Sequence, residues 1–80
     1  MVIYLEKFDA RRNMFRFYNV CLTRSLEGYP GLERSWGRIG AKGQSKLEWF
    51  DHIGDAKVAL TNIVGVKIKS GYSLCDVSRV

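Results

Sequence analysis

The feature that most constrains this chain is a change in the spacing of its apolar residues near Asp55. Before that residue, apolar and polar side chains alternate, as in residues 14–22, which is typical of a half-buried strand. After it, apolar residues recur at helical spacing, namely Ala56, Ala59, Leu60, Ile63 and Val64. We therefore expect an α+β fold, with an antiparallel β-sheet of about four to five strands and one α-helix packed on it.

Turn-forming residues divide the first part of the chain into strands. We expect strands over 2–8, 14–22, 32–40 and 44–50, the last two joined as a hairpin by a tight turn over 40–43, and a short strand near 72–77 that rejoins the sheet. The helix should begin near Asp51 or Asp55 and stop by Gly71. No linker or repeat interrupts the 80 residues, so residues 1–80 are expected to be a single domain.

Charge is concentrated in one half of the chain. The formal net charge is +5, but residues 7–46 hold nine basic and three acidic side chains, which gives +6 for that segment alone. This distribution favours an anionic partner, nucleic acid first, although a basic surface that only maintains solubility would explain the charge equally well. No stretch is long and apolar enough to span a membrane, and the N-terminus is a poor signal peptide, so we expect a cytoplasmic protein without a membrane partner.

The residue types needed for catalysis or metal binding are sparse. Cys21 and Cys75 lack the paired spacing of a zinc site, and we expect both to be reduced thiols that are at least half-buried. His52 has no nucleophile near it in the sequence. The glycine-rich stretch 37–43 lacks the spacing and the following Lys-Ser/Thr of a nucleotide-binding loop. The chain is therefore expected to be no enzyme and to carry neither cofactor nor metal.

The expected third strand holds the densest functional signal. Side chains alternate across a strand, so Arg34, Trp36 and Arg38 should share one face, while Ile39 points the other way and suits the core. Guanidinium groups bind phosphates, an indole offers a flat surface to a sugar or base, and Gly37 permits close approach of a backbone or a phosphate. This pattern points to nucleic-acid binding.

Structural explanations exist for the same residues. Trp36 could be a core tryptophan, and the two arginines could be surface charges or partners of Glu33 or Glu48. The aromatic residues Phe15, Phe17 and Tyr18 could form a base-stacking platform, but a domain this small needs them in its core. Trp49 is expected in the core or at the hairpin edge.

Residues 36–40, Trp-Gly-Arg-Ile-Gly, followed by Gly43-Gln44, resemble the signature of the WGR domain. This domain is the DNA-break-sensing module of some poly(ADP-ribose) polymerases and also occurs as small stand-alone bacterial proteins. The resemblance extends over nearly the whole chain. It includes residues 4–7, Arg12-Asn13, residues 16–20, and Lys67 with Gly71-Tyr72.

The resemblance implies a role for individual residues. Trp36 would lie against the terminal sugar at the 5′ end of a DNA break, with backbone contacts near Gly37, and Arg38 would support the bound assembly. Asn13 and Arg16 match positions that reach the phosphate backbone, and Gln44 matches a polar residue after the hairpin turn. No polymerase domain accompanies the motif in this sequence, so activation of a linked enzyme does not carry over.

These observations together predict a non-catalytic module that binds nucleic acid, most simply DNA at ends or nicks. The predicted nucleic-acid-binding residues are Trp36, Gly37, Arg38, Arg34, Asn13, Arg16 and Gln44. Two alternatives stay open, RNA in place of DNA, and a protein-interaction adaptor that docks an acidic partner through the same face. Nothing in the sequence specifies the oligomeric state.

Overall fold

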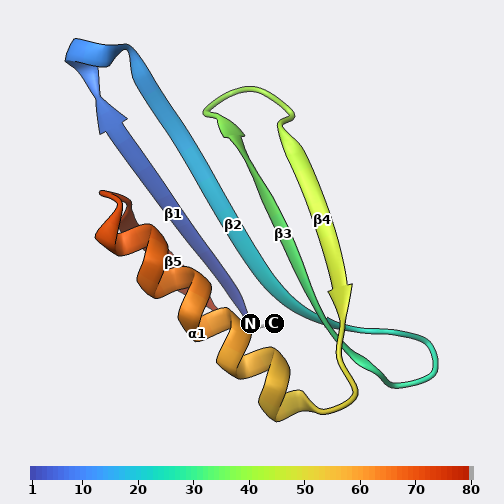
Figure 1. The fold of residues 1–80 in the computed structure, drawn as a ribbon. Helices are drawn as coiled ribbons and strands as arrows, with labels where there is room; N and C mark the ends of the chain where they lie inside the picture. Colours follow the sequence, from blue (N-terminus) through green and yellow to red (C-terminus); the bar gives the residue numbers. More distant parts are fainter. Residues whose placement is uncertain (80) are drawn as a thin grey trace.

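The computed structural model describes residues 1–79 and contains a five-stranded sheet with one long helix on it (Figure 1). The elements in chain order are β1 (Val2–Asp9), a 3₁₀ turn (Ala10–Arg12), β2 (Met14–Arg24), β3 (Pro30–Arg38), β4 (Gln44–Trp49), α1 (Ile53–Lys69) and β5 (Ser73–Ser78). The strands lie in the order β4-β3-β2-β1-β5, and each neighbouring pair is antiparallel. The predicted α+β fold is confirmed, including the return of the last strand to the sheet.

Element boundaries differ from the predicted ones by a few residues. β3 begins at Pro30, because a proline without an N–H is tolerated at the first position of a strand. It ends at Arg38, and the link to β4 spans residues 39–43, so it is longer than the tight turn expected. The helix begins at Ile53, with Asp55 in its first turn and Lys67 and Lys69 in its last, as the helix dipole favours.

The helix α1 covers one face of the sheet (Figure 1). The hydrophobic core lies between them. Its buried members are Leu5, Tyr18, Val20, Leu32 and Leu60. Leu5 pairs with Tyr18 and Tyr18 with Trp36, so these three side chains lie on one face. The pairing of β3 with β2 contains no bulge, so every second side chain of β3 points to that face. These side chains are Leu32, Arg34, Trp36 and Arg38.

The expectation that the core lies on the Ile39 side of β3 is therefore wrong. The Arg34–Trp36–Arg38 face is the face that α1 covers, because it continues the apolar row begun by Leu32 and Leu5. Ile39 is only half-buried beyond the strand. Basic and core side chains thus alternate along one surface rather than occupying opposite ones.

The aromatic cluster is divided between the two faces of the sheet. Tyr18 is buried under the helix, as predicted, with 4% of its surface exposed. Phe15 and Phe17 are only half-buried and lie outside the core cluster, so their predicted core position is wrong. Phe17 stacks with Tyr4 at 6.4 Å between ring centroids, and Phe15 meets the exposed Phe8 edge-on at 5.9 Å.

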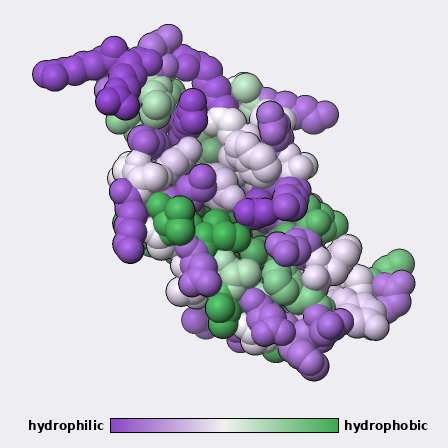
Figure 2. All heavy atoms as spheres, in the orientation of Figure 1, coloured by the Kyte–Doolittle hydropathy of each residue, from purple (hydrophilic) through white to green (hydrophobic). Residues whose placement is uncertain are grey.

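The described part of the chain is elongated, with principal extents of 46 × 24 × 19 Å. Figure 2 shows hydrophilic side chains gathered toward the end that carries the β1–β2 connection, and hydrophobic ones nearer the middle. That connection contains Arg11 and Arg12, both exposed. One end of the molecule is therefore strongly basic, and the site described below opens there.

Two glycines hold the β3–β4 hairpin together by close backbone approach. A Cβ at Gly37 would lie 2.8 Å from the Gly43 Cα. Gly43 has a φ of +74°, and a Cβ there would overlap the carbonyl of Trp36. Gly37 is therefore required by the neighbouring backbone, whether or not a ligand also approaches it.

Gly43→Ala should lower the free energy of unfolding by about 1–3 kcal/mol, because it adds steric overlap to an unfavourable backbone conformation. Gly40→Ala is the matched control, since Gly40 has a φ of +90° but open space around its Cβ position. Urea denaturation of both variants measures the difference. Equal losses would show that the contact with the Trp36 carbonyl does not matter.

Candidate nucleic-acid interface

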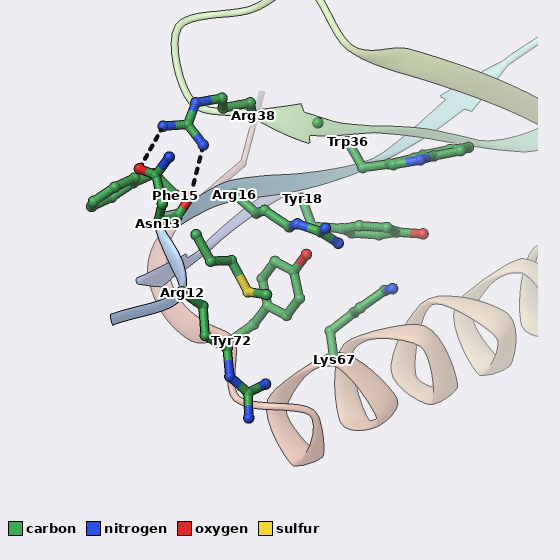
Figure 3. Close-up of a pocket in the computed structure, with 11 residues that line it drawn as sticks. Arg12, Asn13, Phe15, Arg16, Tyr18, Trp36, Arg38, Lys67 and Tyr72 are labelled. Atoms are coloured by element: carbon green, nitrogen blue, oxygen red, sulfur yellow. Dashed lines mark hydrogen bonds between the residues drawn. The ribbon is translucent and has the colours of Figure 1, made fainter. Parts of the chain in front are cut away.

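A hollow of about 570 Å³ opens at the basic end of the sheet, beside the C-terminal turns of α1 (Figure 3). Side chains from β2, β3, the β1–β2 turn and α1 surround it, together with Tyr72, which follows the helix. The residues that line it are Arg12, Asn13, Met14, Phe15, Arg16, Tyr18, Trp36, Gly37, Arg38, Lys67 and Tyr72. We refer to it as the Trp36 hollow.

Trp36 forms one wall of the hollow and also extends the core. Its ring stacks on that of Tyr18 (Figure 3). The ring centroids are 6.0 Å apart and the planes differ by 18°. Tyr18 is buried, whereas Trp36 is only half-buried and packs against the core cluster. The core explanation of Trp36 therefore holds in part, because the residue packs against the core cluster. It also faces the hollow, and its role in nucleic-acid binding stays a prediction.

Lys67 brings a positive charge from α1 to the opposite wall (Figure 3). Its ammonium lies 4.6 Å from the Tyr18 ring centroid and 5.6 Å from that of Tyr72. Tyr72 meets Tyr18 edge-on at 6.3 Å. These cation–π contacts hold Lys67 in place without neutralising its charge, so it stays available to an anion.

Arg38 is anchored to the β1–β2 turn (Figure 3). Its guanidinium donates hydrogen bonds to the Asn13 carbonyl at 2.9 Å and to Asn13 Oδ1 at 3.3 Å. It also lies 5.3 Å from the Phe15 ring centroid. Asn13 adopts a left-handed φ of 52°, which asparagine tolerates better than most residues. Arg38 and Asn13 therefore fix each other at the rim of the hollow.

Three basic residues lie directly opposite one another on neighbouring strands. Lys7 on β1 pairs with Arg16 on β2, and Arg16 pairs with Arg38 on β3. Like charges at directly opposite positions in a sheet are destabilising. Among residues 1–79, one ion pair forms, between Arg12 Nε and Asp9 Oδ2 at 3.5 Å. No carboxylate in that range therefore pairs with the three charges of this basic row. Such an arrangement suits an anion that lies across the strands.

The hollow brings together five of the seven residues predicted from the sequence: Asn13, Arg16, Trp36, Gly37 and Arg38. Gln44 is exposed on the edge strand β4 and lies outside the lining. Arg34 faces a smaller, adjacent hollow against α1. Neither arginine of β3 forms the suggested ion pair with Glu33 or Glu48 in the described residues.

Six residues of the lining lie outside the predicted binding set. They are Arg12, Met14, Phe15, Tyr18, Lys67 and Tyr72. Arg12, Tyr18, Lys67 and Tyr72 lie in segments that resemble the WGR domain, and for Phe15 and Tyr18 the sequence favoured a place in the core over base stacking. Helical spacing identifies the buried stripe of α1, but the position of Lys67 over the Tyr18 ring depends on how the helix crosses the sheet.

The cysteines are free thiols, Cys21 half-buried and Cys75 exposed. The expectation that Cys75 is at least half-buried is wrong, because β5 is an edge strand in which residues 73–77 are all exposed. Loss of solvation and the nearby Glu6 carboxylate raise the pKa of the Cys75 thiol. No cluster of three or more His, Cys, Asp or Glu side chains arranged to hold a metal ion occurs in the part of the chain that the structure describes.

The fold and the site thus define a small α+β domain with a basic, aromatic hollow at one end. The WGR domain family model matches residues 1–77, and the chain belongs to this family. The WGR domain is known as a nucleic-acid-binding module, rather than a catalytic one, in proteins of the poly(ADP-ribose) polymerase type.

One relative is the uncharacterized protein y4dW of Sinorhizobium fredii (strain NBRC 101917 / NGR234), which is 39% identical over 70 residues. The match covers 88% of this chain but 34% of the relative, so the chain spans about a third of that protein's length. No solved structure matches. Among residues 1–79, no helix has the length and apolar character needed to cross a membrane.

Proposed function

We propose that this chain is a non-catalytic module that binds nucleic acid through the Trp36 hollow. The observation that carries the proposal is the basic row Lys7–Arg16–Arg38, which has no carboxylate partner among the described residues, beside a stacked aromatic pair. Phosphates would lie along the basic row and against Lys67, while a sugar or base would pack on the exposed part of Trp36. A cytoplasmic location is part of the same proposal.

The preferred ligand in this proposal is DNA at an end or a nick. Trp36 is half-buried within a hollow rather than raised on a flat surface, so a sugar must enter the hollow to reach it. A terminal nucleotide can do so, whereas a nucleotide within a continuous duplex is held by both of its neighbours. Arg38, Asn13 and Arg16 at the rim would then contact the adjoining backbone.

Fluorescence-anisotropy titrations over a range of salt concentrations test the proposal. The probes are a 5′-phosphorylated blunt duplex, a nicked duplex and a closed dumbbell of equal length. With about four to six phosphate contacts, the slope of log K against log[salt] should be about −4 to −5, and both open probes should bind more tightly than the dumbbell.

The other outcomes of this titration point elsewhere. Equal binding to all three probes would reduce the activity to general electrostatic binding. Tighter binding of a matched RNA would reassign the ligand, because contacts to the backbone alone do not select DNA. A slope near zero, with binding only to an acidic protein, would replace the proposal with an adaptor function.

A further inference from the structure

A second hollow, of about 300 Å³, lies between β3 and α1, next to the Trp36 hollow. It is lined by Tyr18, Arg34, Asn62, Ile63, Val66 and Lys67, and we call it the Arg34 groove. Tyr18 and Lys67 line both hollows, so the two adjoin along a common wall. The Arg34 groove therefore continues the basic surface from the end of the sheet along the helix.

Arg34 carries an unsatisfied donor in this groove. Its Nε is buried and has no hydrogen-bond partner in the described residues. A buried donor without an acceptor is costly, and more so when it belongs to a charged group, so native proteins rarely leave one unpaired. Opposite Arg34, β4 places another cation, Lys46, and β2 places the apolar Val20. The strand neighbours of Arg34 therefore supply no carboxylate to pair with its charge.

We propose that Arg34, Asn62 and Lys67 form a second phosphate-binding site, for an internal backbone phosphate of the nucleic-acid strand whose end occupies the Trp36 hollow. The inference rests on the proposed function. It extends the binding surface from the end of the nucleic-acid strand to a path along α1. The guanidinium and the ammonium supply charge, and the Asn62 amide supplies a neutral donor. Ile63 and Val66 form the apolar part of the lining.

The first test uses duplex DNA. Arg34→Met removes the charge and the Nε donor while keeping a side chain that can fill the groove, and Arg24→Met removes the same charge from the exposed far end of β2. Arg34→Met should weaken binding about ten-fold and make the salt slope less negative by about one. Arg24→Met should change neither. The preference for open ends should persist in both variants, because Trp36 is intact.

Asn62 is tested by a double-mutant cycle. If Asn62→Ala and Arg34→Met remove contacts to one phosphate, the loss in affinity of the double variant should be smaller than the product of the two single losses. Independent effects that multiply would place the two side chains at different sites. Thermal unfolding confirms that each variant is folded before its affinity is interpreted.

The second test needs neither DNA binding nor a variant. In ¹H–¹⁵N spectra of the wild-type chain, titration with inorganic phosphate should shift the Arg34 Nε–Hε resonance saturably, while that of Arg24 stays unchanged. If this shift occurs but no DNA binds, the phosphate site stands and the proposed function fails. The second site is overturned if DNA binds but two results fail: Arg34→Met leaves the salt slope unchanged, and the Arg34 resonance does not respond to phosphate.

Discussion

Replacing Trp36 with alanine is expected to lower the free energy of unfolding by about 2–4 kcal/mol and to abolish any preference for open DNA ends. The large loss of stability follows from the position of the ring, which stacks on the buried Tyr18 and packs against the core. Removal of a large packed aromatic side chain costs more than removal of an exposed one. Urea denaturation and anisotropy titration of the same preparation measure the two effects.

Two further variants separate stability from binding. Trp36→Phe keeps a ring on Tyr18 and should restore much of the stability, while it presents less flat surface to a terminal sugar. Trp49→Ala is the matched tryptophan control, because Trp49 is 48% exposed at the end of the edge strand β4. It should leave DNA binding unchanged. Loss of end preference with Trp49→Ala but not with Trp36→Ala would contradict the assigned site.

Reversing two charges of the basic row should produce the largest loss of affinity. The double variant Arg16→Glu with Arg38→Glu is expected to weaken DNA binding by about 100-fold or more at ~0.1 M salt, because it replaces two phosphate-binding cations with repelling carboxylates. Arg24→Glu with Lys57→Glu is the control, since it makes the same change in net charge at exposed positions outside the hollow. Equal losses in the two double variants would show that only net charge matters.

Removing a charge from the basic row should stabilise the fold, although it weakens DNA binding. Arg16 is exposed, with Lys7 on one side and Arg38 on the other. Arg16→Gln should therefore raise the free energy of unfolding by a few tenths of a kcal/mol at low salt, since it relieves repulsion between like charges. The same variant should bind DNA more weakly. A decrease in stability, measured by urea denaturation, would mean that Arg16 has a structural partner instead.

The sequence predicted the elements of this fold well because their signals are local. Alternation in β2, the glycines around the β3–β4 hairpin and the apolar spacing of α1 each depend on neighbouring residues only. The face of β3 that meets the core was predicted wrongly. Alternation places Arg34, Trp36 and Arg38 together, but it does not reveal which face the helix covers. Leu32, at the same period, is buried in the core cluster that includes Leu60 of the helix.

The site could be predicted only where its residues lie on strands that carry the family motif. Arg16 and Arg38 pair at neighbouring ends of β2 and β3, and Asn13 lies in the turn just before β2, so the sheet register brings the three together. Lys67 reaches the hollow only through the packing of α1, and the unsatisfied Nε of Arg34 is a property of burial. Neither can be read from spacing along the chain.

The most direct test of the central claim uses the two tryptophan indoles of the chain as reporters. Trp36 lines the hollow at the basic end, and Trp49 lies at the end of β4 outside it. A short 5′-phosphorylated blunt duplex is titrated into the ¹⁵N-labelled chain while both indole N–H resonances are followed. We expect a saturable shift of the Trp36 resonance, with the Trp49 resonance unchanged. A shift confined to Trp49, or saturable binding that leaves Trp36 unaffected, would contradict binding through the Trp36 hollow.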